Sequence, residues 1–178
     1  MKKHCVDLKK TGQFSNFFLD YLEGKEPLRP FYSHLPNLES FDAAIKAKQF
    51  SADKRQILVE VLESQYAGIP LSPVAAQQLD ALRDEKTFTV TTGHQLNLFT
   101  GPLYFIYKLI STINLAKRLQ ERYPDYRFVP VYWMASEDHD FEEVSAVSVF
   151  GKSLKWEAAV KGAVGRTPLS FGHLPLER

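Results

Sequence analysis

Two apolar runs separated by a long helical pattern form the clearest hydrophobic signal in the chain. The runs are Phe88–Thr92 and Phe128–Ala135, and each has the length and composition of a buried strand. Between them, a helix is expected to begin after Thr100-Gly101-Pro102. Its apolar stripe, which we expect to be buried, comprises Leu103, Ile106, Ile110, Ile113 and Ala116. A strand, a helix and a second strand in this order predict a βαβ unit with parallel strands.

The residues before the first strand alternate between helical patterns and the breakers glycine and proline. They predict four helices, at residues 13–22, 38–47, 51–66 and 72–82. Ser15 or Asn16 would cap the first helix, and Ser72 the fourth. The third helix is expected to bury Ile57, Leu58, Val61, Leu62 and Tyr66. We therefore divide the chain into an N-terminal helical segment, residues 1–86, packed on the core, and a sheet domain, residues 87–178.

After the second strand, the pattern indicates a short turn or helix at Phe141–Val144 and then a β-hairpin. The hairpin strands would be Val147–Phe150 and Leu154–Ala158, with Gly151-Lys152-Ser153 as the turn. Residues 162–178 show no periodicity. The fold class is therefore α/β: a parallel sheet preceded by a helical segment and followed by a hairpin.

Composition narrows the class of ligand. The 178 residues carry a net charge of only +1, so no basic surface for nucleic acid or membrane is indicated, and small metabolites are the natural ligands. The one cysteine, Cys5, cannot form an internal disulfide. The chain has neither a secretory signal nor an apolar run of about 18 residues, so a cytoplasmic protein is expected.

Polar residues follow both predicted strands. Gly93-His94-Gln95 comes after the first strand, and Glu137–Asp140 comes after the second. Because the carboxyl ends of parallel strands lie at one edge of a sheet, the two clusters should meet there. This edge is where open α/β sheets bind their ligands.

The first cluster precedes the start of the long helix. Free backbone N–H groups after Gly101 could bind a phosphate or a carboxylate, and Lys108, one turn further on, could contact the same anion. The chain contains neither a Walker motif nor a G-x-G-x-x-G motif. A plain turn, with Gly101 and Pro102 marking the helix start and Lys108 facing solvent, remains the alternative.

The second cluster places four ionisable residues, Glu137, Asp138, His139 and Asp140, at the end of an apolar strand. Such residues could bind a divalent metal, act as acid or base, or hold an amino or hydroxyl group of a substrate. In an extended chain they point alternately to opposite sides, so only two or three can serve one site. The alternative is a solvated loop in which Asp138 or Asp140 caps the next helix.

The same residues carry a resemblance to a known family. The runs TTGHQLNLFTGPLYFIYK and PVYWMASEDHDFEEV, in this order, closely resemble the cysteine-adding enzymes of bacillithiol biosynthesis, the BshC family of cysteine ligases. The runs LDALRDEKTFTVTTG and FFLDYLEGKEPLRPFY are also similar to that family. The resemblance therefore spans nearly the whole chain.

The resemblance implies a core similar to the Rossmann-like nucleotidyltransferases and class I synthetases. Residues 87–178 would then be the first part of a Rossmann-like domain. Family members are considerably longer and form homodimers through a helical coiled coil. The chain is therefore expected to be an N-terminal fragment that is inactive when isolated.

The resemblance also implies an activity, the joining of the carboxyl group of L-cysteine to the amine of glucosaminyl malate. A carboxylate must be activated before it forms an amide, so the enzyme needs either ATP or an activated cysteine supplied from elsewhere. ATP/ADP is the expected cofactor, and no metal is predicted. The expected nucleotide- and substrate-binding residues are Gly93, His94, Gln95, Gly101, Lys108 and Glu137. Many family members carry glutamine at the position of His94, which implies a hydrogen-bonding role there.

The expected catalytic residues are His139, Asp138 and Asp140. His139 is the expected base, since histidine changes charge near neutral pH. Two other functions remain open. The unit could be a nucleotide- or sugar-binding module without catalysis of its own, or a metal-dependent hydrolase built on Glu137–Asp140, although the two-histidine zinc motif is missing.

Overall fold

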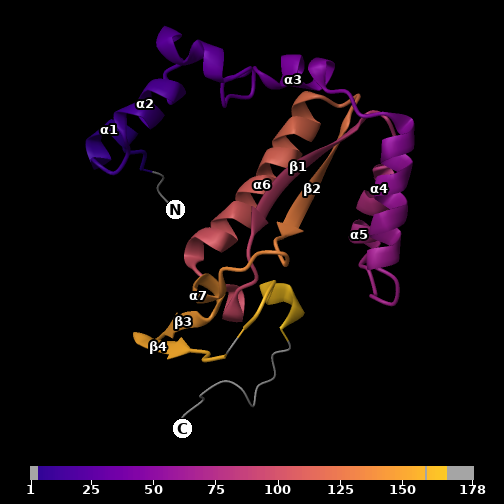
Figure 1. The fold of residues 1–178 in the computed structure, drawn as a ribbon. Coiled ribbons are helices and arrows are strands. Elements are labelled where there is room, and N and C mark those ends of the chain that lie inside the picture. The colour runs from indigo at the N-terminus through magenta and orange to yellow at the C-terminus, as the bar shows by residue number, and fades with distance from the viewer. Residues whose placement is uncertain (1–3, 159, 168–178) are drawn as a thin grey trace. The chain divides into compact units, whose positions relative to one another are not determined.

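The computed structural model describes residues 4–158 and 160–167. The chain divides into two compact units, Met1–Ser51 and Ala52–Arg178, whose elements are labelled in Figure 1. None of the described helices is long and apolar enough to cross a membrane.

The first unit is built from short helices. They are α1 (Leu8–Thr11), α2 (Asn16–Leu22), the 3-10 helix η1 (Glu26–Phe31) and α3 (Phe41–Ala47). The Ser15 side chain accepts a hydrogen bond from the Phe18 N–H, which confirms one of the two predicted caps. Ile45 of α3 is buried.

The second unit contains the sheet and the elements around it. Before the sheet lie α4 (Ala52–Gln65) and α5 (Pro73–Ala81). Then follow β1 (Thr87–His94), η2 (Leu98–Thr100), α6 (Leu103–Arg122) and β2 (Arg127–Met134). The last described elements are α7 (Phe141–Val144), β3 (Ala146–Val149), β4 (Lys152–Lys155) and η3 (Val164–Arg166). As predicted, the Ser72 side chain caps α5 by accepting from the Ala75 N–H.

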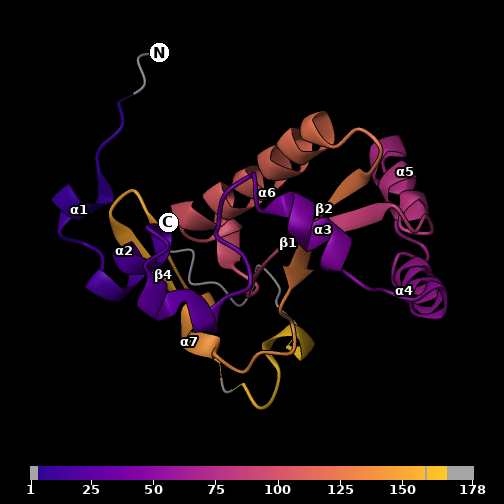
Figure 2. The ribbon, with the colours of Figure 1, turned by 90° about the horizontal axis from the view of Figure 1, so that it is seen from above.

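The pairing of the strands confirms the predicted topology. β1 and β2 are parallel, with Thr87 opposite Arg127 and His94 opposite Met134. β3 and β4 form an antiparallel hairpin, as predicted, but the turn is Phe150-Gly151, because the predicted turn residues Lys152 and Ser153 pair with Val149 and Ser148. In Figures 1 and 2, β1 and β2 lie between α6 on one side and α4 with α5 on the other. The strands are thus covered by helices from both directions, as parallel strands require.

The core beside α4 and α5 is apolar. Val59, Ala81, Leu82 and Val129 form a buried cluster, against which Leu62, Leu79 and Val131 pack. Arg55 is also buried, and its guanidinium donates to the Leu82 and Thr87 carbonyl oxygens at 2.7 Å and 3.2 Å. A buried arginine is tolerated here because its hydrogens satisfy carbonyls at the end of α5 and at the start of β1.

Two predicted helical stripes were wrong. In α4 the expected residues Ile57, Val61 and Tyr66 are exposed, and Leu58 and Leu62 are half-buried. The buried face instead contains Arg55 and Val59, since the bonds of Arg55 turn that side toward the sheet. In the stripe of α6 only Ala116 is buried as expected, and these residues are exposed: Leu103, Ile106, Ile110 and Ile113.

Two side-chain contacts explain why α6 faces the strands with a different side from the predicted one. Phe105 packs edge-on against Tyr132 of β2, and Lys108 bonds a carbonyl at the end of β1. These contacts turn toward the strands the side of the helix that carries Phe105 and Lys108, with Ala116 and Leu119 buried further along it. The division at residue 86 stays a prediction, and the structure groups α4 and α5 with the sheet through contacts of α5 with β2.

Candidate functional site at the carboxyl edge of the sheet

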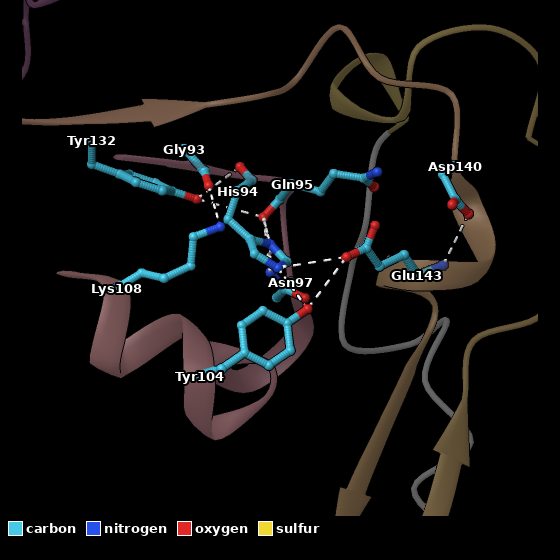
Figure 3. A network of polar contacts seen from close by, with 9 residues as sticks. All are labelled: Gly93, His94, Gln95, Asn97, Tyr104, Lys108, Tyr132, Asp140 and Glu143. Carbon is cyan, nitrogen blue, oxygen red and sulfur yellow. Dashed lines mark hydrogen bonds and ion pairs between the residues drawn. The ribbon is translucent and has the colours of Figure 1, made fainter. Parts of the chain in front are cut away.

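The two predicted polar clusters leave the sheet at the same edge. Gly93 lies opposite Trp133, and His94 lies opposite Met134, so β1 and β2 end together. Beyond this carboxyl edge, one loop leads to α6 and the other leads to α7. Figure 3 shows the polar contacts that gather there.

His94 is the centre of these contacts. Its side chain is 5% exposed, and its Nδ1 lies 2.8 Å from Asn97 Nδ2 and 3.1 Å from the Gln95 carbonyl oxygen. Asn97 Nδ2 also donates to the Gln95 carbonyl oxygen at 2.8 Å. The amide therefore gives one hydrogen to each acceptor, so Nδ1 of His94 accepts. In the neutral ring Nε2 then carries the hydrogen and donates to Tyr104 Oη at 2.8 Å.

Glu143 of α7 completes the arrangement. Tyr104 Oη donates to Glu143 Oε1 at 3.4 Å, and His94 Nε2 lies 3.5 Å from the same oxygen. Burial, together with the charge and hydrogen bond of Glu143, raises the pKa of Tyr104, which therefore remains a donor. We call these five residues the His94 network: His94, Gln95, Asn97, Tyr104 and Glu143. Its donors point in one direction, from Asn97 through His94 and Tyr104 to the Glu143 carboxylate (Figure 3).

Two further side chains hold the end of β1. Lys108 Nζ donates to the Gly93 carbonyl oxygen at 2.6 Å, so the lysine lies at the carboxyl edge. An ammonium has three hydrogens, so an anion could bind beside this carbonyl. Tyr132 Oη donates to the His94 carbonyl oxygen at 3.1 Å, and burial raises the pKa of Tyr132.

The backbone between the network and α6 is strained. Phe99, Thr100 and Gly101 have φ values of 48°, 71° and 61° in succession. At Gly101 a Cβ atom would lie 2.6 Å from Asn97 Cγ, so only glycine fits. Consecutive residues of positive φ are uncommon and concentrate at functional sites.

The second predicted cluster makes local contacts instead. Asp140 caps α7 by accepting from the Glu143 N–H at 3.2 Å, as one of the two alternatives had it. Asp138 accepts from the Asp140 N–H at 3.0 Å, and Glu137 accepts from Trp133 Nε1 at 3.3 Å. His139 is exposed, and within residues 4–158 and 160–167 its side chain makes no hydrogen bond. The cluster and the His94 network share the carboxyl edge, and the bond from the Glu143 N–H to Asp140 joins them; among the described residues, no hydrogen bond or ion pair links a side chain of the cluster to a side chain of the network.

Sequence reasoning gave no role to four members of the site: Asn97, Tyr104, Tyr132 and Glu143. Asn97 and Tyr132 gave no signal beyond lying near a strand end. Glu143 could have been found, because Asp140-Phe141-Glu142-Glu143 has the spacing of a capping box. The structure departs from that motif, since the Glu143 side chain turns to Tyr104 and His94 instead of returning to the cap.

Two other features bear on the choice of site. A cleft of about 710 Å³ lies at the amino ends of the strands, beside Thr87 and Arg127. That end is opposite to the one at which α/β sheets bind ligands, so we assign the site to the carboxyl edge. Among the described residues, no three His, Cys, Asp or Glu side chains are grouped to hold a metal ion.

The chain is similar to known proteins over nearly its whole length. Residues 1–174 match the family described as "Bacillithiol biosynthesis BshC, N-terminal Rossmann-like domain". Proteins named "Putative cysteine ligase BshC" from Flavobacterium psychrophilum and Flavobacterium johnsoniae are 50% and 49% identical over 169 and 168 residues. A protein of the same name from Christiangramia forsetii is 49% identical over 171 residues. In each case the match covers 93% of this chain and 32% of the relative, so the chain spans about a third of their length.

Proposed function

Since the chain belongs to the BshC family and forms its N-terminal Rossmann-like domain, we propose that the protein is a cysteine ligase of bacillithiol biosynthesis. The ligase joins the carboxyl group of L-cysteine to the amine of glucosaminyl malate by forming an amide. The observation that supports a site in this part of the chain is the His94 network at the carboxyl edge. Such a network supplies oriented donors and a carboxylate to a polar substrate.

Amide formation in water requires an activated carboxyl group. ATP supplies this activation in our proposal, and its phosphates bind near Gly93 and Gly101, where α6 begins. Lys108 supports this placement, because its ammonium lies beside the Gly93 carbonyl, at the same edge. Gln95 lies in the same loop, and its Oε1 is buried without a hydrogen-bond partner among the described residues, so it can receive a substrate donor.

His139 is the proposed base that takes the proton from the attacking amine. Its exposure supports this role, because both ring nitrogens can reach a substrate. Asp138 and Asp140 hold the loop that carries it, through the hydrogen bonds to the Asp140 and Glu143 N–H groups. Glu137, fixed by Trp133, lines the same loop.

The remaining assignments concern the whole protein. We propose that it acts in the cytoplasm as a homodimer, joined by a coiled coil formed outside these residues. The relatives are about three times as long as the matched part, so the isolated chain is expected to be inactive.

Turnover by the protein in its natural length tests the proposal. Mixed with L-cysteine and glucosaminyl malate, it should form bacillithiol, detected by mass spectrometry, and ATP should be required. His139→Ala should lower turnover strongly; unchanged turnover would remove His139 from the mechanism. Calorimetric binding of ATP, ADP or glucosaminyl malate without any product would instead favour the module without catalysis.

A further inference from the structure

Glu143 is a carboxylate with fixed hydrogen-bond donors on one side and access to solvent. Tyr104 Oη and His94 Nε2 lie 3.4 Å and 3.5 Å from Oε1, while the side chain remains 39% exposed. A carboxylate has room for about four hydrogen bonds, so the single bond from Tyr104 leaves lone pairs for a ligand.

The charge of this carboxylate is not neutralised by a neighbouring cation. Among the described residues no lysine or arginine nitrogen lies within 4.0 Å of it, and in the tautomer set by Asn97 the Nε2 hydrogen of His94 goes to Tyr104. An ordered carboxylate whose described side-chain donor is the Tyr104 hydroxyl favours a cation as its next partner.

The backbone of α7 around Glu143 is fixed by its cap and by packing. Asp140 caps α7, and the following residues Val144 and Ser145 are 4% and 1% exposed. Phe141 packs edge-on against Trp156, with ring centroids 5.0 Å apart. The short helix thus fixes the Glu143 backbone, and Tyr104 and His94 fix its side chain, which is the preorganisation that a binding residue needs.

We propose that Glu143 binds the primary ammonium group of the substrate whose amine receives the cysteinyl group. This assignment rests on the proposed function and adds to it the residue that recognises the amine. The primary amine donates to Glu143 while the His94 network holds the carboxylate in place.

The test compares Glu143→Gln with Glu142→Gln in the natural-length protein. Glutamine keeps an acceptor for Tyr104 but removes the charge, so the network should persist, and thermal unfolding checks that it does. Glu142 is exposed on the same helix, and its side chain makes no described hydrogen bond or ion pair, so it serves as the matched control. For Glu143→Gln, KM for glucosaminyl malate should rise about 10- to 100-fold, with KM for L-cysteine unchanged.

A binding measurement separates this inference from the proposed function. Calorimetry would compare glucosaminyl malate with its N-acetylated form, which has no ammonium group. The unmodified protein should bind the acetylated form about 10-fold or more weakly, whereas Glu143→Gln should bind both forms alike. Equal discrimination by Glu143→Gln and Glu142→Gln would overturn the role of Glu143, even if ligation is observed. Absence of ligation with the predicted binding difference would overturn the ligase and leave the amine site standing.

Discussion

The loops that leave β1 and β2 begin at the same edge of the sheet but are held in different ways. The β1 loop, here His94 at the end of β1 together with residues 95–102, is fixed by the Asn97 side chain, by side chains from α6 and β2, and by strained backbone. The β2 loop, residues 135–140, is held by its own cap and by backbone bonds to η3, from Val164 to Asp138 and from Gly165 to Ser136.

This difference shows that a loop rich in ionisable residues is not necessarily the better-ordered part of a binding site. The β2 loop has more ionisable residues, yet the described contacts of Asp138 and Asp140 are those of a turn and a cap. The β1 loop has one histidine, yet its ring contacts residues from the loop, from α6 and from α7. The β1 loop is therefore the better-ordered half of the site, because its side chains contact distant elements, although it carries fewer charges.

The largest predicted effect concerns Gly101. Gly101→Ala should destabilise the protein by about 3 kcal/mol, since alanine is strained at this φ and its Cβ would meet Asn97. Chemical denaturation measures the change. Gly68→Ala is the control, because Gly68 also has positive φ but nothing within 4 Å, and should cost only about 1 kcal/mol. Equal losses would show that the Asn97 contact is unimportant.

His94 and His139 allow the two loops to be compared directly. His94→Ala should cost about 2 kcal/mol, because it leaves Asn97 and Tyr104 without a buried partner. His139→Ala should change stability by less than about 0.5 kcal/mol, as expected for an exposed residue. His94→Gln should recover part of the loss, since glutamine has an acceptor and a donor on one side chain. Similar costs for both alanine variants would remove the distinction between the loops.

Tyr132 gives a pH-dependent test of the β1 loop. Tyr132→Phe should cost about 1 kcal/mol at neutral pH, through loss of the bond to the His94 carbonyl. Burial raises the pKa of Tyr132 above its usual value of 10.0, so the folded state favours the neutral phenol. That contribution is complete below pH 10 and is lost as the pH rises through the raised pKa. Thermal unfolding should therefore show the gap between the two proteins narrowing above pH 10; a constant gap would contradict the assignment.

Small effects are also predicted for the cap in the β2 loop. Asp140→Ala should cost about 0.5 kcal/mol, since it removes the cap of a helix of four residues. Asp140→Asn should be nearly neutral, because asparagine caps helices equally well. A loss above about 2 kcal/mol, measured by denaturant unfolding, would mean that this loop is held as firmly as the other.

Sequence patterns predicted the topology well because it depends on local order. Strand, helix and strand spacing fixed the parallel pairing, and Ser15 and Ser72 marked the helix starts by a cap that needs only neighbouring residues. The buried faces of α4 and α6 were wrong for a different reason. Arg55 and Lys108 turn toward the sheet to bond carbonyls, and hydrophobic periodicity assigns such residues to solvent.

The sequence predicted the edge of the sheet at which the candidate site lies, but not the contacts of the His94 network. Gly93, His94, Gln95 and Lys108 were identified from their place after the predicted strand Phe88–Thr92. The structure puts them at the carboxyl edge, although Gly93 and His94 still belong to β1, where they pair with Trp133 and Met134. The meeting of His94 with Glu143 depends on how α7 packs, 49 positions further along the chain, and no local pattern encodes that distance. The family resemblance, in contrast, rested on two long runs and is confirmed.

The most direct test of the central claim compares the ligation activity of two variants, one at the carboxyl edge of the sheet and one at its amino edge. With L-cysteine, glucosaminyl malate and ATP, Lys108→Ala at the carboxyl edge should lower kcat/KM about 10-fold or more. Arg127→Ala, beside the cleft at the amino edge, should leave it within about twofold. The opposite result, with Arg127→Ala inactive and Lys108→Ala active, would move the site to the amino edge and contradict the account.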